Sequence, residues 1–136
     1  MAKSITAARY RPFKPQRAQV PEEVKSEVSF KARQLVDQQL KPAHVEQPEN
    51  PHCNYIADIY TRWHREDFYF CATYVVFSPD AVSPAFEVPF ARMGYLGNGK
   101  FNLAYMGQTG KWCEMYRSLS IDQCLEAVRD EPRFIP

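Results

Sequence analysis

Apolar residues alternate with polar residues, or run together, in five segments between Cys53 and Tyr116. These segments are rich in aromatic and β-branched residues, which suit a pleated and half-buried surface. Short clusters of Gly, Asn, Asp, Ser and Pro separate them, and such residues form turns. Because these connections are too short for crossover helices, the pattern predicts five consecutive antiparallel strands.

The inner strands carry the most specific signals. Residues 68–77 are apolar on both faces, so this second strand should lie inside the sheet. The third strand, residues 86–96, contains Pro89, which cannot donate a hydrogen bond to a ladder and therefore predicts an edge or a bulge. Gly97, Asn98 and Gly99 then predict a tight hairpin into the fourth strand.

Helical spacing appears on both sides of the strand region. Apolar residues recur every three or four positions from Val24 to Leu40, which predicts a helix that begins at Pro21. Pro42 should end this helix because it disfavours helical geometry at Lys41. Near the other end of the chain, Ser120 and Gln123 form a capping box, so a second helix should begin at Ile121.

These elements predict an α+β fold, with an N-terminal helix, a five-stranded antiparallel β-meander and a short C-terminal helix. Both helices should cover one face of the sheet. The domain division that follows is a basic arm over residues 1–20 and a single α+β domain over residues 21–136.

Charge is distributed unevenly along the chain. Residues 1–20 hold five basic residues and no acid, whereas the remainder of the 136 residues holds 12 basic and 16 acidic residues. Pro12 and Pro15 would break a helix or strand, which predicts an extended or disordered arm. Such an arm could neutralise phosphates or lie along an acidic protein surface; a solvated tail and an organellar targeting peptide are the alternatives. Its candidate binding residues are Lys3, Arg9, Tyr10, Arg11, Phe13, Lys14 and Arg17.

A second candidate binding surface lies on the predicted sheet. Tyr60, Arg62 and His64 alternate along the first strand and should share one face, with Arg92 and Trp112 on later strands. Aromatic rings on a sheet can stack with bases, and arginine can bind phosphate, so this platform could contact nucleic acid. The other interpretation of the same residues is a hydrophobic layer covered by the helices or by a second subunit.

The chain carries little that indicates catalysis. It has none of the glycine-rich phosphate loops, nucleophile elbows or paired-histidine zinc motifs that mark common enzyme families, and no cofactor is predicted. Cys113 could act as a reactive thiol if His64 approached it on the sheet, although a cysteine in a sheet is more often a small apolar residue. His52 and Cys53 match no zinc-ligand spacing, so no metal site is predicted.

The start of the chain and its apolar runs bear on where the protein is located. Residues 1–16 lack the apolar stretch and cleavage pattern of a secretory signal, and no apolar run reaches the ~18 residues that span a membrane. We therefore expect a cytoplasmic protein with no membrane partner. Its four cysteines should then be reduced thiols, with a disulfide framework as the minor alternative.

The second half of the chain carries a pattern of strand and turn residues. A Pro-x-Ala-basic strand is followed by an aromatic strand, a turn into Lys-Trp and an acidic C-terminal helix. The matching positions are Pro89, Ala91, Arg92, Tyr95, Phe101, Tyr105, Trp112, Leu125, Val128, Asp130 and Phe134. This pattern resembles a family of small bacterial proteins of unknown function, over roughly residues 25–135.

The resemblance implies the fold described above and no activity. The chain departs from the family pattern at Phe101, where members tend to have Trp, at Cys113, where they have His, and near Tyr116, where their Tyr comes one residue earlier. The functional expectation is a non-catalytic binding or assembly module, with a protein partner or a homo-oligomer. The alternatives are a weak nucleic-acid-binding protein and a small enzyme with an unrecognised site.

Overall fold

The computed structural model describes residues 19–49, 53–77 and 84–136. Its elements follow one another in the predicted order, which confirms the α+β class. Their bounds are α2 (Glu22–Leu35), η1 (Val36–Leu40), α3 (Lys41–His44), β1 (Tyr55–His64), β2 (Asp67–Val75), β3 (Ala85–Gly97), β4 (Lys100–Met106), β5 (Trp112–Leu119), α4 (Ile121–Asp130) and η2 (Pro132–Phe134).

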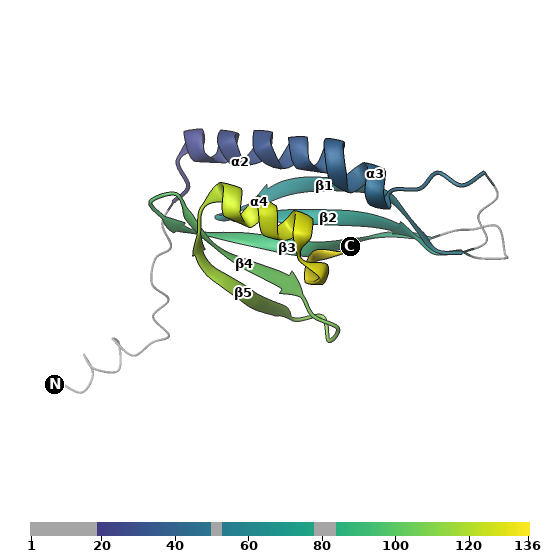
Figure 1. The fold of residues 1–136 in the computed structure, drawn as a ribbon. Helices are drawn as coiled ribbons and strands as arrows, with labels where there is room; N and C mark the ends of the chain where they lie inside the picture. Colours follow the sequence, from purple (N-terminus) through teal and green to yellow (C-terminus); the bar gives the residue numbers. More distant parts are fainter. Residues whose placement is uncertain (1–18, 50–52, 78–83) are drawn as a thin grey trace, which may run out of the picture.

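The five strands form one sheet in sequential order, and every neighbouring pair is antiparallel (Figure 1). The meander prediction is therefore confirmed. Pro89 lies in β3, an inner strand, beside a register shift between Phe70 and Cys71 of β2. The bulge makes room for a proline that has no N–H to donate, as its position in the sequence had indicated.

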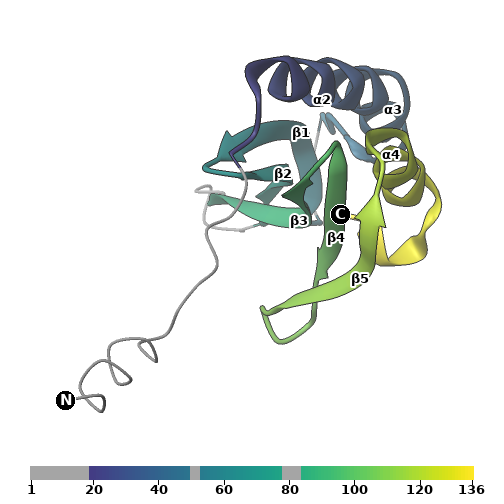
Figure 2. The same cartoon turned by 90° about the vertical axis from the view of Figure 1, so that its left-hand side faces the viewer.

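Both long helices pack on the same face of the sheet (Figure 2). Val28 and Ala32 of α2, with Cys124 and Val128 of α4, are buried against strand residues. The strands contribute three fully buried rings, Phe68, Phe70 and Phe101. This one-sided covering confirms the predicted arrangement and leaves the other face of the sheet without a described helix.

The first helix does not end where the sequence predicts. Lys41 keeps helical angles, with φ −62° and ψ −48°, and the chain continues through α3. A π-helical turn, η1, precedes Pro42, and the N–H of Lys41 bonds to the carbonyl of Val36, five residues back. The wider turn accommodates a proline that would clash with a regular α-helical turn. Leu40 is buried in the core, which holds this extension against the sheet.

The second helix begins as predicted. The Ser120 side chain accepts a hydrogen bond from the Gln123 N–H, and the Gln123 side chain accepts one from the Ser120 N–H. In the described segments, no helix is long and apolar enough to cross a membrane.

Candidate functional site

The face of the sheet that α2 and α4 leave uncovered is called the open face below. Alternation along the strands assigns its side chains, since α2 packs on the Ile59 and Trp63 side of β1. The opposite side of β1 presents Tyr60, Arg62 and His64, as the sequence predicted. Cross-strand register adds further residues to the open face, namely Tyr69, Cys71, Arg92, Asn102, Ala104, Trp112 and Glu114.

Four of these side chains form a continuous stack. The Arg62 guanidinium lies 5.1 Å from the ring centre of Tyr69, and the Tyr69 ring lies 5.8 Å from that of Trp112. The Arg92 guanidinium also lies 5.0 Å from the Trp112 ring centre. A cation over an aromatic face is worth about 0.5–1 kcal/mol at an exposed site, so each contact helps to fix these side chains. We call this set the Arg–aromatic stack.

A hollow with small residues in its lining lies beside Arg92 of the stack. Gly94 and Ala104 line this hollow of about 150 Å³ on the open face, together with Asp67, Arg92, Asn102 and Glu114. Trp112 comes from β5 and reaches Tyr69 of β2 although β3 and β4 lie between them. In Figure 2 the β4–β5 hairpin extends to the side opposite the helices, and Trp112 is the first residue of β5 after this turn.

The charges around the stack are mixed. Within the described part of the chain, neither Arg62 nor Arg92 takes part in an ion pair. Glu114 also lies on the open face and pairs with Arg117, at 2.6 Å. The open face therefore offers two oriented guanidinium groups beside carboxylates, rather than a uniformly basic surface.

Tyr60 borders the stack and is constrained differently. Its hydroxyl oxygen is buried and has no hydrogen-bond partner among the described residues. Burial, helped by the nearby Glu87 carboxylate, raises the pKa of this hydroxyl, so it stays protonated at neutral pH.

The thiols of this region are poorly suited to nucleophilic chemistry. Burial raises the pKa of Cys71, although the neighbouring Arg62 opposes that shift. Cys113 follows Trp112 in β5 and so points to the helix-covered face, whereas His64 lies on the open face. The approach of His64 that a reactive Cys113 would require is therefore absent, because the two side chains lie on opposite faces of the sheet. In the described segments, no three metal-binding side chains come together.

His64 is exposed at the end of β1 and is not part of the stack, so only Arg62, Arg92 and Trp112 of the predicted platform are joined directly. The predicted arm residues before residue 19 lie outside the described segments. Sequence reasoning missed Tyr69. The two-residue turn at Arg65 and Glu66 was the available signal, because it places Tyr69 directly opposite Arg62.

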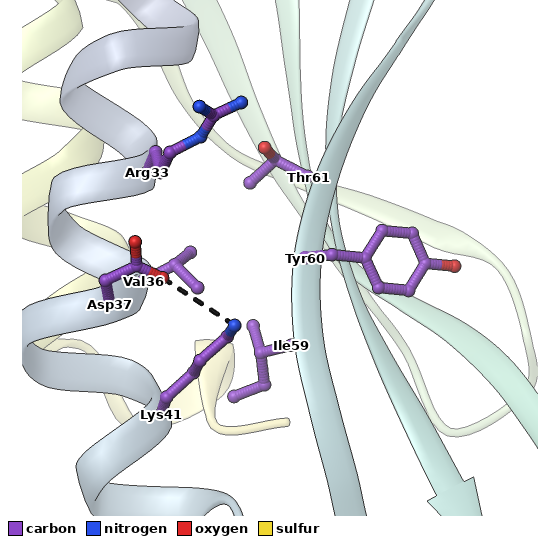
Figure 3. A pocket seen from close by; sticks show the side chains of 7 residues that line it. All are labelled: Arg33, Val36, Asp37, Lys41, Ile59, Tyr60 and Thr61. Atoms are coloured by element: carbon purple, nitrogen blue, oxygen red, sulfur yellow. Dashed lines mark ion pairs between the residues drawn. The ribbon is translucent and has the colours of Figure 1, made fainter.

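A second hollow lies between the helical layer and the edge of β1 (Figure 3). It measures about 300 Å³ and is bounded by η1 on one side and by residues 59–61 on the other. Lys41 lies 3.7 Å from Asp37 and 3.4 Å from Asp58, so it connects the helix to the strand. We call this hollow the β1 groove.

Comparison with known families identifies the family of this chain. The family model for DUF3024, a domain of unknown function, matches residues 19–136. The chain belongs to the DUF3024 family. No curated protein and no solved structure matches it. Membership of DUF3024 confirms the resemblance to a family of unknown function and adds no activity.

Proposed function

We propose that this protein is a non-catalytic binding module of the cytosol that docks a protein partner on the open face of its sheet. The observation that carries the proposal is the Arg–aromatic stack. Tyr, Trp and Arg are the residue types that dominate binding energy in protein interfaces. Here four such side chains are already ordered outside the hydrophobic core, so binding would cost little additional side-chain entropy.

The surroundings of the stack favour a protein over a nucleic acid. Glu114 lines the hollow beside Arg92, and a carboxylate there would repel a phosphate backbone. A protein surface of mixed charge can pair with both the Glu114 carboxylate and the Arg92 guanidinium. The small floor at Gly94 and Ala104 gives room for one inserted side chain.

Nucleic acid is the second candidate, because Arg62 and Arg92 lie over aromatic rings without an ion pair in the described segments. Stacked guanidinium groups can bind phosphates while neighbouring rings stack with bases. The five basic residues of the arm would add to such binding. This interaction would weaken steeply as salt concentration rises.

Affinity capture with the full chain tests the proposal. Trp112→Ala removes one of the two rings of the stack, the one that contacts both Tyr69 and Arg92. Ile135→Ala removes an exposed apolar side chain outside the stack. We expect a nuclease-resistant protein partner to be retained by the native chain and by Ile135→Ala. Its affinity for Trp112→Ala should fall ~30-fold, as for an interface residue worth about 2 kcal/mol. Equal affinity for both variants, or a captured species that nuclease removes, would refute the proposal.

A further inference from the structure

The two outer edges of the sheet are not alike. β1 pairs with β2 from Asp58 to His64 without a register shift. The pairing of β5 is interrupted twice, and Ser118 has a φ of 57°. Irregular edges resist the addition of another strand, whereas a regular edge is a template for one. The edge of β1 is therefore the better template.

The free part of this edge has defined limits. At one end, Val45 forms a parallel bridge with Ile56, and the Glu46 N–H bonds to the Ile56 carbonyl at 2.9 Å. A register shift follows between Ile56 and Asp58. At the other end, β1 stops at His64 before the turn. Among the described residues, no second strand pairs with the seven residues from Asp58 to His64, and Thr61 is at their centre.

The backbone of this segment is oriented for pairing. A two-residue turn makes His64 and Asp67 a hydrogen-bonded pair, and such pairs alternate along an antiparallel ladder. The N–H and C=O groups of Ile59, Thr61 and Trp63 consequently point away from β2. In Figure 3 the Ile59 and Thr61 side chains point toward the helix across the β1 groove, and the Tyr60 side chain points to the opposite face of the strand.

We propose that the occupant of this edge is a second copy of the same chain, whose β1 pairs antiparallel with this one about Thr61. A register centred on Thr61 pairs all seven residues from Asp58 to His64, and it places helix-side residues opposite helix-side residues. It places Asp58 opposite the partner's His64 and Tyr60 opposite the partner's Arg62. Ile59 meets the partner's Trp63 on the helix side. The segment is thus complementary to itself through two Tyr60–Arg62 pairs, which can make aromatic–cation contacts, and two Ile59–Trp63 pairs, which are apolar.

The helical layer adds to this interface. Phe30 lies two turns before Asp37, which lines the β1 groove, and these positions fall on nearly the same side of the helix. The Phe30 side chain is 64% exposed. A second copy beside β1 would cover this ring and extend one sheet across two chains. The open faces of the two chains would then lie on the same side of the joined sheet. This dimer goes beyond the proposed function and does not depend on it.

Sedimentation equilibrium of the full chain tests the pairing. We expect a mass of about twice 15.8 kDa at micromolar concentration. Thr61→Pro removes the outward N–H at the centre of the pair, and an edge strand tolerates such a proline in the monomer. We expect its association to weaken at least ~10-fold, through two lost hydrogen bonds. The matched variant Thr61→Val keeps the N–H and should remain a dimer.

Hydrogen exchange on the unmodified chain decides the question if Thr61→Pro does not fold. In the dimer, the amides of Ile59, Thr61 and Trp63 should exchange as slowly as those of Tyr60 and Arg62. Dilution to the monomer should make the first three exchange faster. A monomer at all concentrations would overturn the proposal. So would fast exchange at these three amides in a dimer, or a folded Thr61→Pro variant that dimerises normally.

Discussion

Arg62 and Trp112 illustrate how far single residues could be placed from the sequence. Period-two alternation predicted that Tyr60, Arg62 and His64 share a face, and the structure confirms it. The contact between Trp112 and Tyr69 could not be predicted, because it crosses β3 and β4. Three strand spacings of about 4.8 Å separate these residues in a flat sheet, so their contact depends on the bend of the β4–β5 hairpin.

The Trp63 indole connects β1 to α2 and allows a stability prediction. Its Nε1–H donates to the Ser29 hydroxyl at 3.0 Å in a partly buried site. Ser29→Ala should lower the free energy of unfolding by about 1 kcal/mol relative to Ser26→Ala. Ser26 is exposed on the same helix, so the control removes the effect of helix propensity. Urea unfolding measures the difference, and equal stabilities would show that the hydrogen bond contributes nothing.

The Cys124 thiol predicts how stability changes at alkaline pH. Burial raises the pKa of this thiol from 9.0 to about 12. As pH rises, the unfolded chain therefore loses this proton before the folded chain does. The contribution of the protonated thiol to the free energy of unfolding is full below pH 9 and is lost between pH 9 and 12. The loss is on the order of 4 kcal/mol at most.

Cys124→Ala removes this titration. The variant should be less stable at neutral pH, because the buried sulfur leaves a small cavity. Its stability should fall less steeply above pH 9 than that of the native chain. Other groups with a raised pKa act in the same direction and remain in both proteins, namely Tyr60, Cys71, Tyr74 and Tyr116. Parallel stability curves above pH 9 would contradict the assignment.

The helices show why some element boundaries follow from sequence and others do not. Ser120 and Gln123 satisfy each other's backbone groups within four residues, so the start of α4 was predictable from local chemistry. The end of the first helix was not, because Pro42 is accommodated by a π-helical turn and by burial of Leu40. Lys41 further ties this turn to Asp58, a contact distant in sequence.

The capping box of α4 gives a prediction at the scale of the element. Ser120→Ala removes the acceptor for the Gln123 N–H and should cost about 1 kcal/mol of stability. Ser120→Asp keeps a capping oxygen and should stay close to the native value. Thermal unfolding compares the two variants. If both melted at the same temperature, the cap would not contribute to stability.

At the scale of the whole molecule, both α2 and α4 lie on one side of a five-stranded sheet, and no helix of the described segments covers the open face. The sequence predicted this layering because short turns force a meander and two apolar helix stripes need one common face. The charge of the sequence was a poorer guide to the ligand. The basic arm suggested phosphate binding, whereas the open face combines Arg62 and Arg92 with the carboxylate of Glu114. The Glu114 carboxylate beside Arg92 is the reason for proposing a protein partner in preference to nucleic acid.

Site-specific photo-crosslinking tests the docking of a protein on the open face most directly. A photoreactive phenylalanine analogue replaces Tyr69 in the stack in one protein and replaces exposed Ile135 in the control. We predict a discrete protein adduct, resistant to nuclease, from the Tyr69 position and none from the Ile135 position. Equal adducts at both positions, no adduct at Tyr69, or an adduct made only with nucleic acid would contradict it.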